Sequence, residues 1–520
     1  FPLRFLSLQQ LQRIANVLAK AEEIRRRENL GGDEFSVGYL VGSGNTPNTL
    51  RAGKYTNNIR KAQEDEEFQK SVKYVTTCPF CGEKEVSIDG DLERGRIIHQ
   101  CENPDCDEVK RNGGEPAPLP VYVTDREIYR YTPTFVVSTI DKISIVGMQR
   151  RMRAVLFGRT SLKCAKHGYS GENRCIADTG ILNDAGQCDQ DDWEEVEPVD
   201  PPSLLIQDEL HLLREEFGSF DSHYETLIQQ LNRAFTDDTW HTKIVAATAT
   251  IKGAEQQVEA LYMKDTNVFP SPSPRLKQSF YAYAHPTRIQ RRMLGALPRT
   301  LSRTYAIEKI HEEYARAIQE YRAAPETLYD TLTQVSDEYT LEQAELPSDF
   351  ESLEVIIDDI LDDYETQVSY HYSRDNTDLM KRVLRTMINV HLSDDDEPYY
   401  PLNGQLMTGH TPLEDVSSVL EILENLDELD SPADAVHMLI ATSMISHGVD
   451  VDALDFIGFF GLPRNTAEYI QSYSRVGRKW PGTVFLLFDP MRTRDRSYYR
   501  HFSYHQEYQD LLVEATPLER

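Results

Sequence analysis

At 520 residues the chain is too long for one ordinary domain, and we expect two or three. Its 85 acidic against 55 basic residues give a formal net charge of −30, which excludes a surface that attracts nucleic acid as a whole and requires any such site to be a local basic channel. No apolar run approaches the roughly 18–20 residues that cross a bilayer, so we expect a cytoplasmic protein that makes no membrane contact.

The first chemical signal along the chain is a group of cysteines. All seven lie between positions 78 and 188, in which TCPFCG supplies Cys78 and Cys81 and QCENPDC supplies Cys101 and Cys106. A C-x2-C followed by a C-x4-C presents four soft ligands on two tight turns, as tetrahedral zinc requires. The alternative, a redox-active C-x-x-C pair, would leave the second pair without a role.

A second ligand set follows in the same region. CAKH supplies Cys164 and His167, and Cys175 and Cys188 come after it in a stretch rich in Gly and Asn. Three cysteines and one histidine complete a second zinc set, although His99 is a competing ligand. We therefore expect one or two structural Zn²⁺ ions, because neither set leaves an open position for catalysis.

Next comes an apolar run that ends at two adjacent carboxylates. Residues 203–213 read SLLIQDELHLL, which predicts a buried strand with Asp208 and Glu209 at its carboxyl end. Ligands bind at this edge of an open α/β sheet, and two acids there indicate a metal ligand and a base. About forty residues later TKIVAATATI repeats the pattern, with Thr248 and Thr250 at the strand end.

Two arginines mark the last informative segment. MLIATSMISHGVDVDALDFIGFFG predicts a strand, a loop, a short helix and a second strand, and it leads into NTAEYIQSYSRVGRKWPG. There Gln471, Arg475 and Arg478 fall at i, i+4 and i+7, so we predict that they share one helix face. Two arginines on one face, after a loop that contains Asp450, indicate that an anion faces them.

In this order the segments resemble the motifs of superfamily 2 helicases. DELH, TAT, ATSMISHGVDVD and QSYSRVGR are similar to motifs II, III, V and VI, and PLRFLSLQQ and FVVSTIDKI are similar to motifs Ia and Ib. LMTGHTPLEDVSSVL resembles the segment after motif IV. The run from ATSM to RVGR, the tail RDRSYYRHFSYHQEYQDLLVEAT and the cysteine-bearing insertion are similar to the helicase subunits of DISARM anti-phage systems.

The resemblance implies an α/β fold with two RecA-like parallel-sheet domains. The first would span residues 1–275, with a zinc-binding insertion at about 74–199. The second would span 276–520, with an α-helical insertion at about 303–382. FPSPSPRLK at 269–277 reads as the linker between them.

The resemblance also implies roles for single residues. Asp208 would hold Mg²⁺, Glu209 would deprotonate the attacking water, and Arg475 and Arg478 would reach the γ-phosphate of ATP. Coupling of the ATP site to the nucleic-acid site is implied for His211, Thr248, Thr250, Gly448, Asp450 and Gln471. Contacts with the nucleic-acid strand are implied for Arg4, Ser138, Thr139 and Thr442.

One family feature is missing from the sequence. No G-x-x-x-x-G-K-[ST] phosphate-binding loop is found, and the pair Gly53–Lys54 is followed by Tyr55. Either the loop precedes residue 1 in a longer protein, or a degenerate helicase has lost hydrolysis and kept binding. Retention of the acid pair and of both arginines favours the first account.

These expectations define a function and an alternative. The chain is expected to be an ATP-dependent DNA helicase or translocase subunit of a DISARM-like anti-phage system that uses ATP and Mg²⁺. Its expected partners are DNA, single-stranded or with a single-stranded end, and a DrmB-like subunit. The alternative is an ATPase-deficient scaffold that binds DNA or senses DNA ends.

Overall fold

The computed structural model divides into two compact units, one that extends to Asn267 and one that begins at Val268. It describes residues 4–41, 52–139, 142, 152–170, 175, 188, 193–210, 213, 215–236, 239–248, 254–270, 278, 280, 282–283, 289–331, 357, 360–394, 399–409, 411, 413–426, 429, 431–443, 445, 451 and 453–513. The two units have separate sheets and separate hydrophobic cores.

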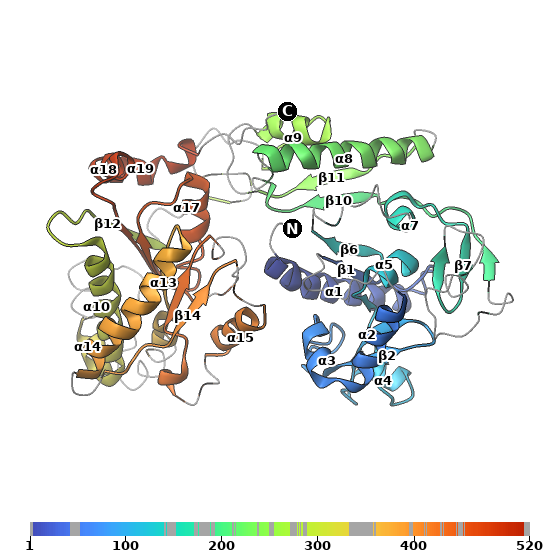
Figure 1. The fold of residues 1–520 in the computed structure, drawn as a ribbon, viewed down its shortest axis with the longest axis horizontal. Helices are drawn as coiled ribbons and strands as arrows, with labels where there is room; N and C mark the ends of the chain where they lie inside the picture. The colour runs from blue at the N-terminus through green and yellow to red at the C-terminus, as the bar shows by residue number, and fades with distance from the viewer. Residues whose placement is uncertain are drawn as a thin grey trace. The chain divides into compact units, whose positions relative to one another are not determined.

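Unit 1 combines parallel sheets with two small antiparallel sheets (Figure 1). Its helices are α1 (Arg4–Arg27), α2 (Ala52–Glu64), α3 (Glu66–Val72), α4 (Asp107–Arg111), α5 (Asp125–Tyr131), α7 (Met152–Phe157), α8 (Glu215–Phe235) and α9 (Ala254–Tyr262). Its strands are β1 (Val37–Leu40), β2 (Val86–Asp91), β3 (Arg96–Cys101), β4 (Ala117–Pro118), β5 (Val121–Tyr122), β6 (Phe135–Ser138), β7 (Leu162–Cys164), β8 (Gly168–Ser170), β9 (Trp193–Glu195), β10 (Leu204–Gln207) and β11 (Lys243–Ala246).

The parallel strands of unit 1 form two groups among the described residues, in the orders β5-β1-β6 and β10-β11. Strand β1 is buried along its whole length, as expected for an apolar strand with a neighbour on each side. The cysteine-bearing segments form the antiparallel sheets β2-β3-β4 and β8-β7-β9. The largest core cluster of the unit joins Leu11 of α1 and Tyr39 of β1 to Cys78, Cys101 and Cys106, so the first cysteine set belongs to the core.

Unit 2 is built on one parallel sheet. Its strands, in the order β12-β17-β16-β13-β15-β14, are β12 (Arg291–Ala296), β17 (Gly482–Leu487), β16 (Phe456–Phe460), β13 (Gln367–Tyr370), β15 (Met438–Ala441) and β14 (Gly404–Met407). Its helices are α10 (Arg303–Ala323), α13 (Arg374–Val383), the π-helix η4 (Leu384–Ile388), α14 (Asn389–Asp394), α15 (Leu413–Glu424), η6 (Pro432–Asp434), α17 (Thr466–Tyr473), α18 (Thr493–Arg500), α19 (Phe502–Glu507) and η7 (Gln509–Leu511). With the sheets of unit 1, this confirms the predicted α/β class with parallel sheets.

Part of the expected helical insertion in unit 2 is a strand. Residues 367–370, which lie inside the range 303–382, form β13 between β16 and β15 in the middle of the sheet. The strand is fully buried although two of its four residues are polar. Gln367 and Ser369 are paired there, because the Gln367 Oε1 lies 2.6 Å from the His311 Nδ1 and the Ser369 Oγ lies 2.9 Å from the His371 Nε2. The partner of Gln367 is 56 positions away, and such a partner leaves no signal in the local sequence.

A helix that crosses a bilayer must be both long and apolar. Among the described residues, none of the helices meets both conditions.

Candidate functional site

The first cysteine set comes together as a candidate metal centre. One sulfur from each of Cys78, Cys81, Cys101 and Cys106 lies within 4.8 Å of the others, and three of the four residues are buried. Two hydrogen bonds close the turn that carries the first pair: the Cys78 N–H donates to the Glu83 carbonyl (2.8 Å), and the Gly82 N–H donates to the Cys78 carbonyl (2.9 Å). Gly82 has a φ of +83°, which glycine adopts without strain.

The thiols of this set are held in an environment that suits a cation. Burial raises the pKa of Cys78 to about 11 and also raises the pKa of Cys101. Burial opposes the thiolate of Cys81 as well, but the N–H of Glu83 and the neighbouring cysteine thiols together more than offset it and lower the pKa of Cys81. Zinc binds the thiolate form, so a bound Zn²⁺ would offset the cost of burying these sulfurs. The four residues fit a structural zinc ion.

His99, the competing ligand, lies outside the set. It is fully buried in β3, and its Nε2 accepts a hydrogen bond of 3.1 Å from the Tyr74 N–H. Burial lowers the pKa of His99 to about 3. The histidine is therefore neutral and contributes to the core, while the four cysteines form the ligand group.

The second set also converges. Cys164, His167, Cys175 and Cys188 are buried, and their ligand atoms lie within 4.8 Å of one another. The Nδ1 of His167 is 3.5 Å from the Cys164 sulfur and 3.4 Å from the Cys175 sulfur. Its Nε2 lies 2.9 Å from the Glu93 carbonyl, the kind of outer contact that fixes the ring of a metal-bound histidine. These residues also fit a structural zinc ion.

A buried arginine connects the two sets. Arg130 of α5 is 1% exposed, and its guanidinium donates to the carbonyls of Arg94 (3.1 Å) and Gly95 (2.8 Å) in the β2–β3 hairpin. The same group donates to the carbonyls of His167 (3.2 Å) and Arg126 (3.1 Å). Since Gly95 lies between the first set's ligand pairs and His167 belongs to the second set, one side chain contacts the segments that carry both sets. No motif or spacing in the sequence pointed to this role.

The carboxylate pair lies immediately after a strand, β10, as predicted. The strand is not the buried one that the sequence predicted, since Leu204 and Ile206 are 44% and 46% exposed. Strand β10 is parallel to β11, and the Leu210 N–H donates to the Ala247 carbonyl at 3.0 Å, so the segment after β10 runs beside the end of β11. The Glu209 N–H donates to the Asp208 Oδ1 at 2.9 Å. Glu209 has a φ of +52°, a left-handed conformation that costs a non-glycine residue about 1–3 kcal/mol and concentrates at functional sites.

The other expected residues of unit 1 lie at element ends. Thr248 is exposed and follows β11, next to the Ala247 that contacts the acid segment. Ser138 ends β6, and Thr139 is buried after it, with its N–H donating to the Leu40 carbonyl at 3.3 Å. Arg4 is the first residue of α1. His211 and Thr250 lie outside the described residues.

The two arginines of unit 2 do not share a helix face with Gln471. Helix α17 ends at Tyr473, so Arg475 and Arg478 lie, half-buried, in the turn after it. After Tyr473 the helical hydrogen bonding is replaced, because the Gly477 N–H donates to the Leu454 carbonyl at 2.9 Å and Gly477 takes a φ of +75°. Arg291 of β12 then donates to the carbonyls of Ser474 and Val476 in the turn. The prediction of one helix face is therefore wrong.

Gln471 is buried in α17, and Thr442 follows β15, with its N–H donating to the Met407 carbonyl at 3.3 Å. Gly448 and Asp450 lie outside the described residues.

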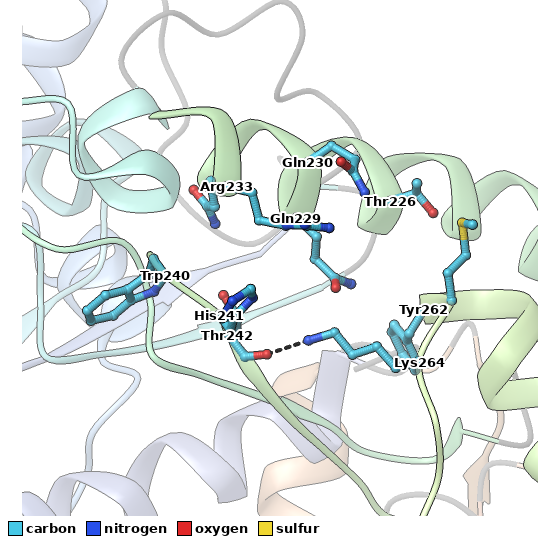
Figure 2. Close-up of a pocket in the computed structure, with 11 residues that line it drawn as sticks. Thr226, Gln229, Gln230, Arg233, Trp240, His241, Thr242, Tyr262 and Lys264 are labelled. Carbon is cyan, nitrogen blue, oxygen red and sulfur yellow. Dashed lines mark hydrogen bonds between the residues drawn. The ribbon is translucent and has the colours of Figure 1, made fainter. Parts of the chain in front are cut away.

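A cavity of about 150 Å³ in unit 1 lies apart from all of these residues (Figure 2). Gln229 of α8 points into it, and Lys264 closes one side with a 2.6 Å hydrogen bond to the Thr242 carbonyl. Thr242 precedes β11, whereas Asp208 follows the parallel strand β10, so the cavity and the acid pair are at opposite strand ends. The cavity is not the expected nucleotide site.

Beside this cavity, buried acids make unit 1 sensitive to pH. Burial, together with the charge of Asp221, raises the pKa of Glu225 in α8 from 4.5 to about 8. The folded protein then binds more protons than the unfolded chain between about pH 4.5 and 8, so its stability falls as the pH rises through that window, by at most about 1.4 kcal/mol per unit for this group. We expect Glu225→Gln to flatten the decline in melting temperature between pH 5 and 8. The exposed Glu255→Gln should keep the wild-type slope; equal slopes in all three proteins would contradict the prediction.

Comparison with protein families identifies a helicase domain in this chain. Residues 401–479 match the helicase conserved C-terminal domain, and this range contains the turn that carries Arg475 and Arg478. The match agrees with the resemblance to superfamily 2 helicases drawn from the motifs, which is confirmed.

One relative is the DISARM protein DrmA of Bacillus paralicheniformis. It is 33% identical over 528 residues, which cover 97% of this chain and 43% of DrmA, so the chain spans less than half of that relative's length. The expected resemblance to DISARM helicase subunits is thereby confirmed.

Solved structures with a similar trace are more distant. The DUF1998 helicase MrfA bound to DNA matches with a TM-score of 0.47 and 11% identity, over 99% of this chain and 49% of MrfA. The Mycobacterium smegmatis helicase Lhr bound to ssDNA and AMP-PNP matches with a TM-score of 0.46 and 11% identity, over 100% of this chain and 42% of Lhr.

Proposed function

We propose that the protein is an ATP-dependent DNA translocase or helicase subunit of a DISARM-like anti-phage system. The observation that carries the proposal is the identity to DrmA along 97% of the chain. It is supported by the position of Asp208 and Glu209 after a parallel strand, with Glu209 in a strained backbone conformation. The two compact units would be two RecA-like domains, and the cysteine sheets an insertion in the first.

The acid pair and the two arginines would have different roles in ATP hydrolysis. Asp208 would hold Mg²⁺, and Glu209 would orient the attacking water and accept its proton. The bound Mg²⁺ would neutralise charge on the phosphate oxygens. Arg475 and Arg478 would stabilise the charge that develops on the γ-phosphate. His211, Thr248, Thr250, Gly448, Asp450 and Gln471 would couple this site to the nucleic acid.

A phosphate-binding segment would pack against the β10–β11 pair of unit 1. Within the described part of unit 1, β11 pairs with β10 alone. Leu204 and Ile206 of β10 and Val245 of β11 are 44–46% exposed, which is high for apolar residues of a parallel sheet. These three side chains share one face of the β10–β11 pair, so a helix that follows the phosphate-binding loop would cover them if it packed on that face.

DNA would be held by phosphate contacts and not through its sequence. Ser138, Thr139 and Thr442 are hydroxyl residues at strand ends, and Arg4 begins α1. We propose single-stranded DNA or a single-stranded end as the substrate, and a DrmB-like subunit as the partner. Zn²⁺ in the two cysteine sets would keep the insertion folded.

The first test is ATP hydrolysis by the full-length protein with and without single-stranded DNA. Hydrolysis should rise with DNA and should fall about 10³-fold or more in Arg478→Ala, the effect expected for an arginine that reaches the γ-phosphate. Arg464→Ala is a matched control, because this exposed arginine also belongs to unit 2. DNA binding without hydrolysis in the wild-type protein would favour the scaffold alternative.

A further inference from the structure

Three side chains of unit 2, outside every helicase motif, form a compact polar cluster. Glu308 and Glu312 lie four residues apart on the buried face of α10, and His391 reaches them from α14. One ligand atom from each lies within 4.8 Å of the others. The His391 side chain is 40% exposed, so the cluster is accessible from solvent at one side.

Glu308 is the unusual member of the cluster. The residue is fully buried, and neither of its carboxylate oxygens has a hydrogen-bond partner within the described part of the chain. In the ranges that the structure describes, its one contact of ion-pair distance is with His391, whose Nδ1 is 3.8 Å from the Oε1. A buried carboxylate without donors costs several kcal/mol, so either a proton or a cation must compensate it.

The neighbouring carboxylate is already compensated. Both oxygens of Glu312 accept from the Lys309 Nζ at 2.8 Å, and its Oε2 lies 2.9 Å from the His391 Nδ1. Arg316 adds a weaker contact of 3.4 Å to the Oε1. The cations Lys309 and Arg316 thus compensate Glu312, whereas the carboxylate of Glu308 has no such partner among the described residues. The 3.8 Å between the Glu308 Oε1 and the His391 Nδ1 is a distance that two ligands of one metal ion can have, since each would lie about 2 Å from it.

A π-helix before α14 orients His391 toward Glu308 and Glu312. The π-helix η4 immediately precedes α14, and its extra residue rotates α14 by roughly 100° relative to a continuous α-helix. Leu384 and Ile388 of this turn are buried in one cluster with Ile307 of α10. Such π-turns occur frequently at functional sites.

We propose that Glu308, Glu312 and His391 form a binding site for a divalent transition-metal ion. Two carboxylate oxygens and an imidazole nitrogen suit Mn²⁺, Fe²⁺ or Zn²⁺. On binding, the His391 Nδ1 would give up its proton and its contact with Glu312, and bind the ion. The metal would link α14 to α10. Helix α10 in turn contacts the sheet through the hydrogen bond between His311 and Gln367 of β13.

Manganese is the probe, because oxygen and nitrogen ligands bind it whereas thiolates prefer zinc. Free Mn²⁺ is titrated by its electron paramagnetic resonance signal into zinc-loaded, nucleotide-free, full-length protein. The wild type should bind one Mn²⁺ that is lost or at least tenfold weaker in Glu308→Gln and in His391→Asn. Glu313→Gln, an exposed neighbour on the same helix, should bind like the wild type.

A melting curve separates the metal from a proton. Mn²⁺ should raise the melting temperature of the wild type and leave that of Glu308→Gln unchanged. Equal Mn²⁺ binding by the wild type and by Glu308→Gln would overturn the proposal. Any weak Mn²⁺ site at Asp208 is present in both proteins, so it would not produce a difference between them. The proposal would also be overturned if Mn²⁺ left the melting temperature of the wild type unchanged and Glu308→Gln melted at a higher temperature than the wild type. The Glu308 carboxyl group would then be neutralised by a proton and not by a metal ion.

Discussion

The Glu209→Gln variant of the full-length protein is expected to lose ATP turnover by about 10²–10⁴-fold while it keeps its affinity for the nucleotide. The amide retains the shape of the side chain but cannot accept a proton from water. Asp208, which would hold the metal, is unchanged. Steady-state hydrolysis with single-stranded DNA measures the first quantity, and titration with a fluorescent ATP analogue measures the second.

The backbone at this position allows a second measurement on the same residue. Because Glu209 has a φ of +52°, Glu209→Gly should relieve strain and raise the free energy of unfolding by about 1 kcal/mol while turnover is lost. A gain of stability with a loss of activity would identify a residue retained for chemistry. Glu195→Gln, an exposed glutamate of the same unit, should change neither quantity. Unchanged turnover in Glu209→Gln would refute its role as the base.

Sequence reasoning succeeded where the chemistry is local. Metal ligands come in pairs from tight turns, so spacing alone joined Cys78 to Cys81 and Cys164 to His167. The strand before Asp208 could be predicted for the same reason, since a short apolar run that ends at two acids is a local pattern. In both cases the residues that matter lie within a few positions of each other.

It failed where a distant residue decides the local structure. Helix α17 stops at Tyr473 because the Gly477 N–H, which another helical turn would have used, donates instead to the carbonyl of Leu454, far earlier in the sequence. The proposed metal site of unit 2 requires that His391 lies beside Glu308, 83 positions earlier, and that a π-turn orients α14. Neither the contact nor the π-turn can be predicted from one sequence. Periodicity reports which face of an element is apolar, but not which far residue will meet it.

The largest effect on folding is expected from Cys101→Ser. Cys101 is fully buried and shares the main core of unit 1 with Leu11 and Tyr39. Structural zinc contributes roughly 10–16 kcal/mol in small metal-dependent domains, which matches or exceeds the roughly 5–15 kcal/mol that hold a domain folded. The variant should therefore lose one of two zinc ions per chain and unfold unit 1.

Two further variants separate the centres. Cys188→Ser should lose the other zinc ion only, with a smaller fall in melting temperature, because Cys188 belongs to a small cluster with Leu162, Cys164 and Cys175. His99→Gln should keep both ions, since His99 lies outside either ligand set. Zinc is counted by mass spectrometry of the purified proteins, and folding is followed by circular dichroism. Two zinc ions and an unchanged melting curve in Cys101→Ser would mean that the four cysteines are a buried thiol cluster, and that the core of unit 1 is stable without a metal.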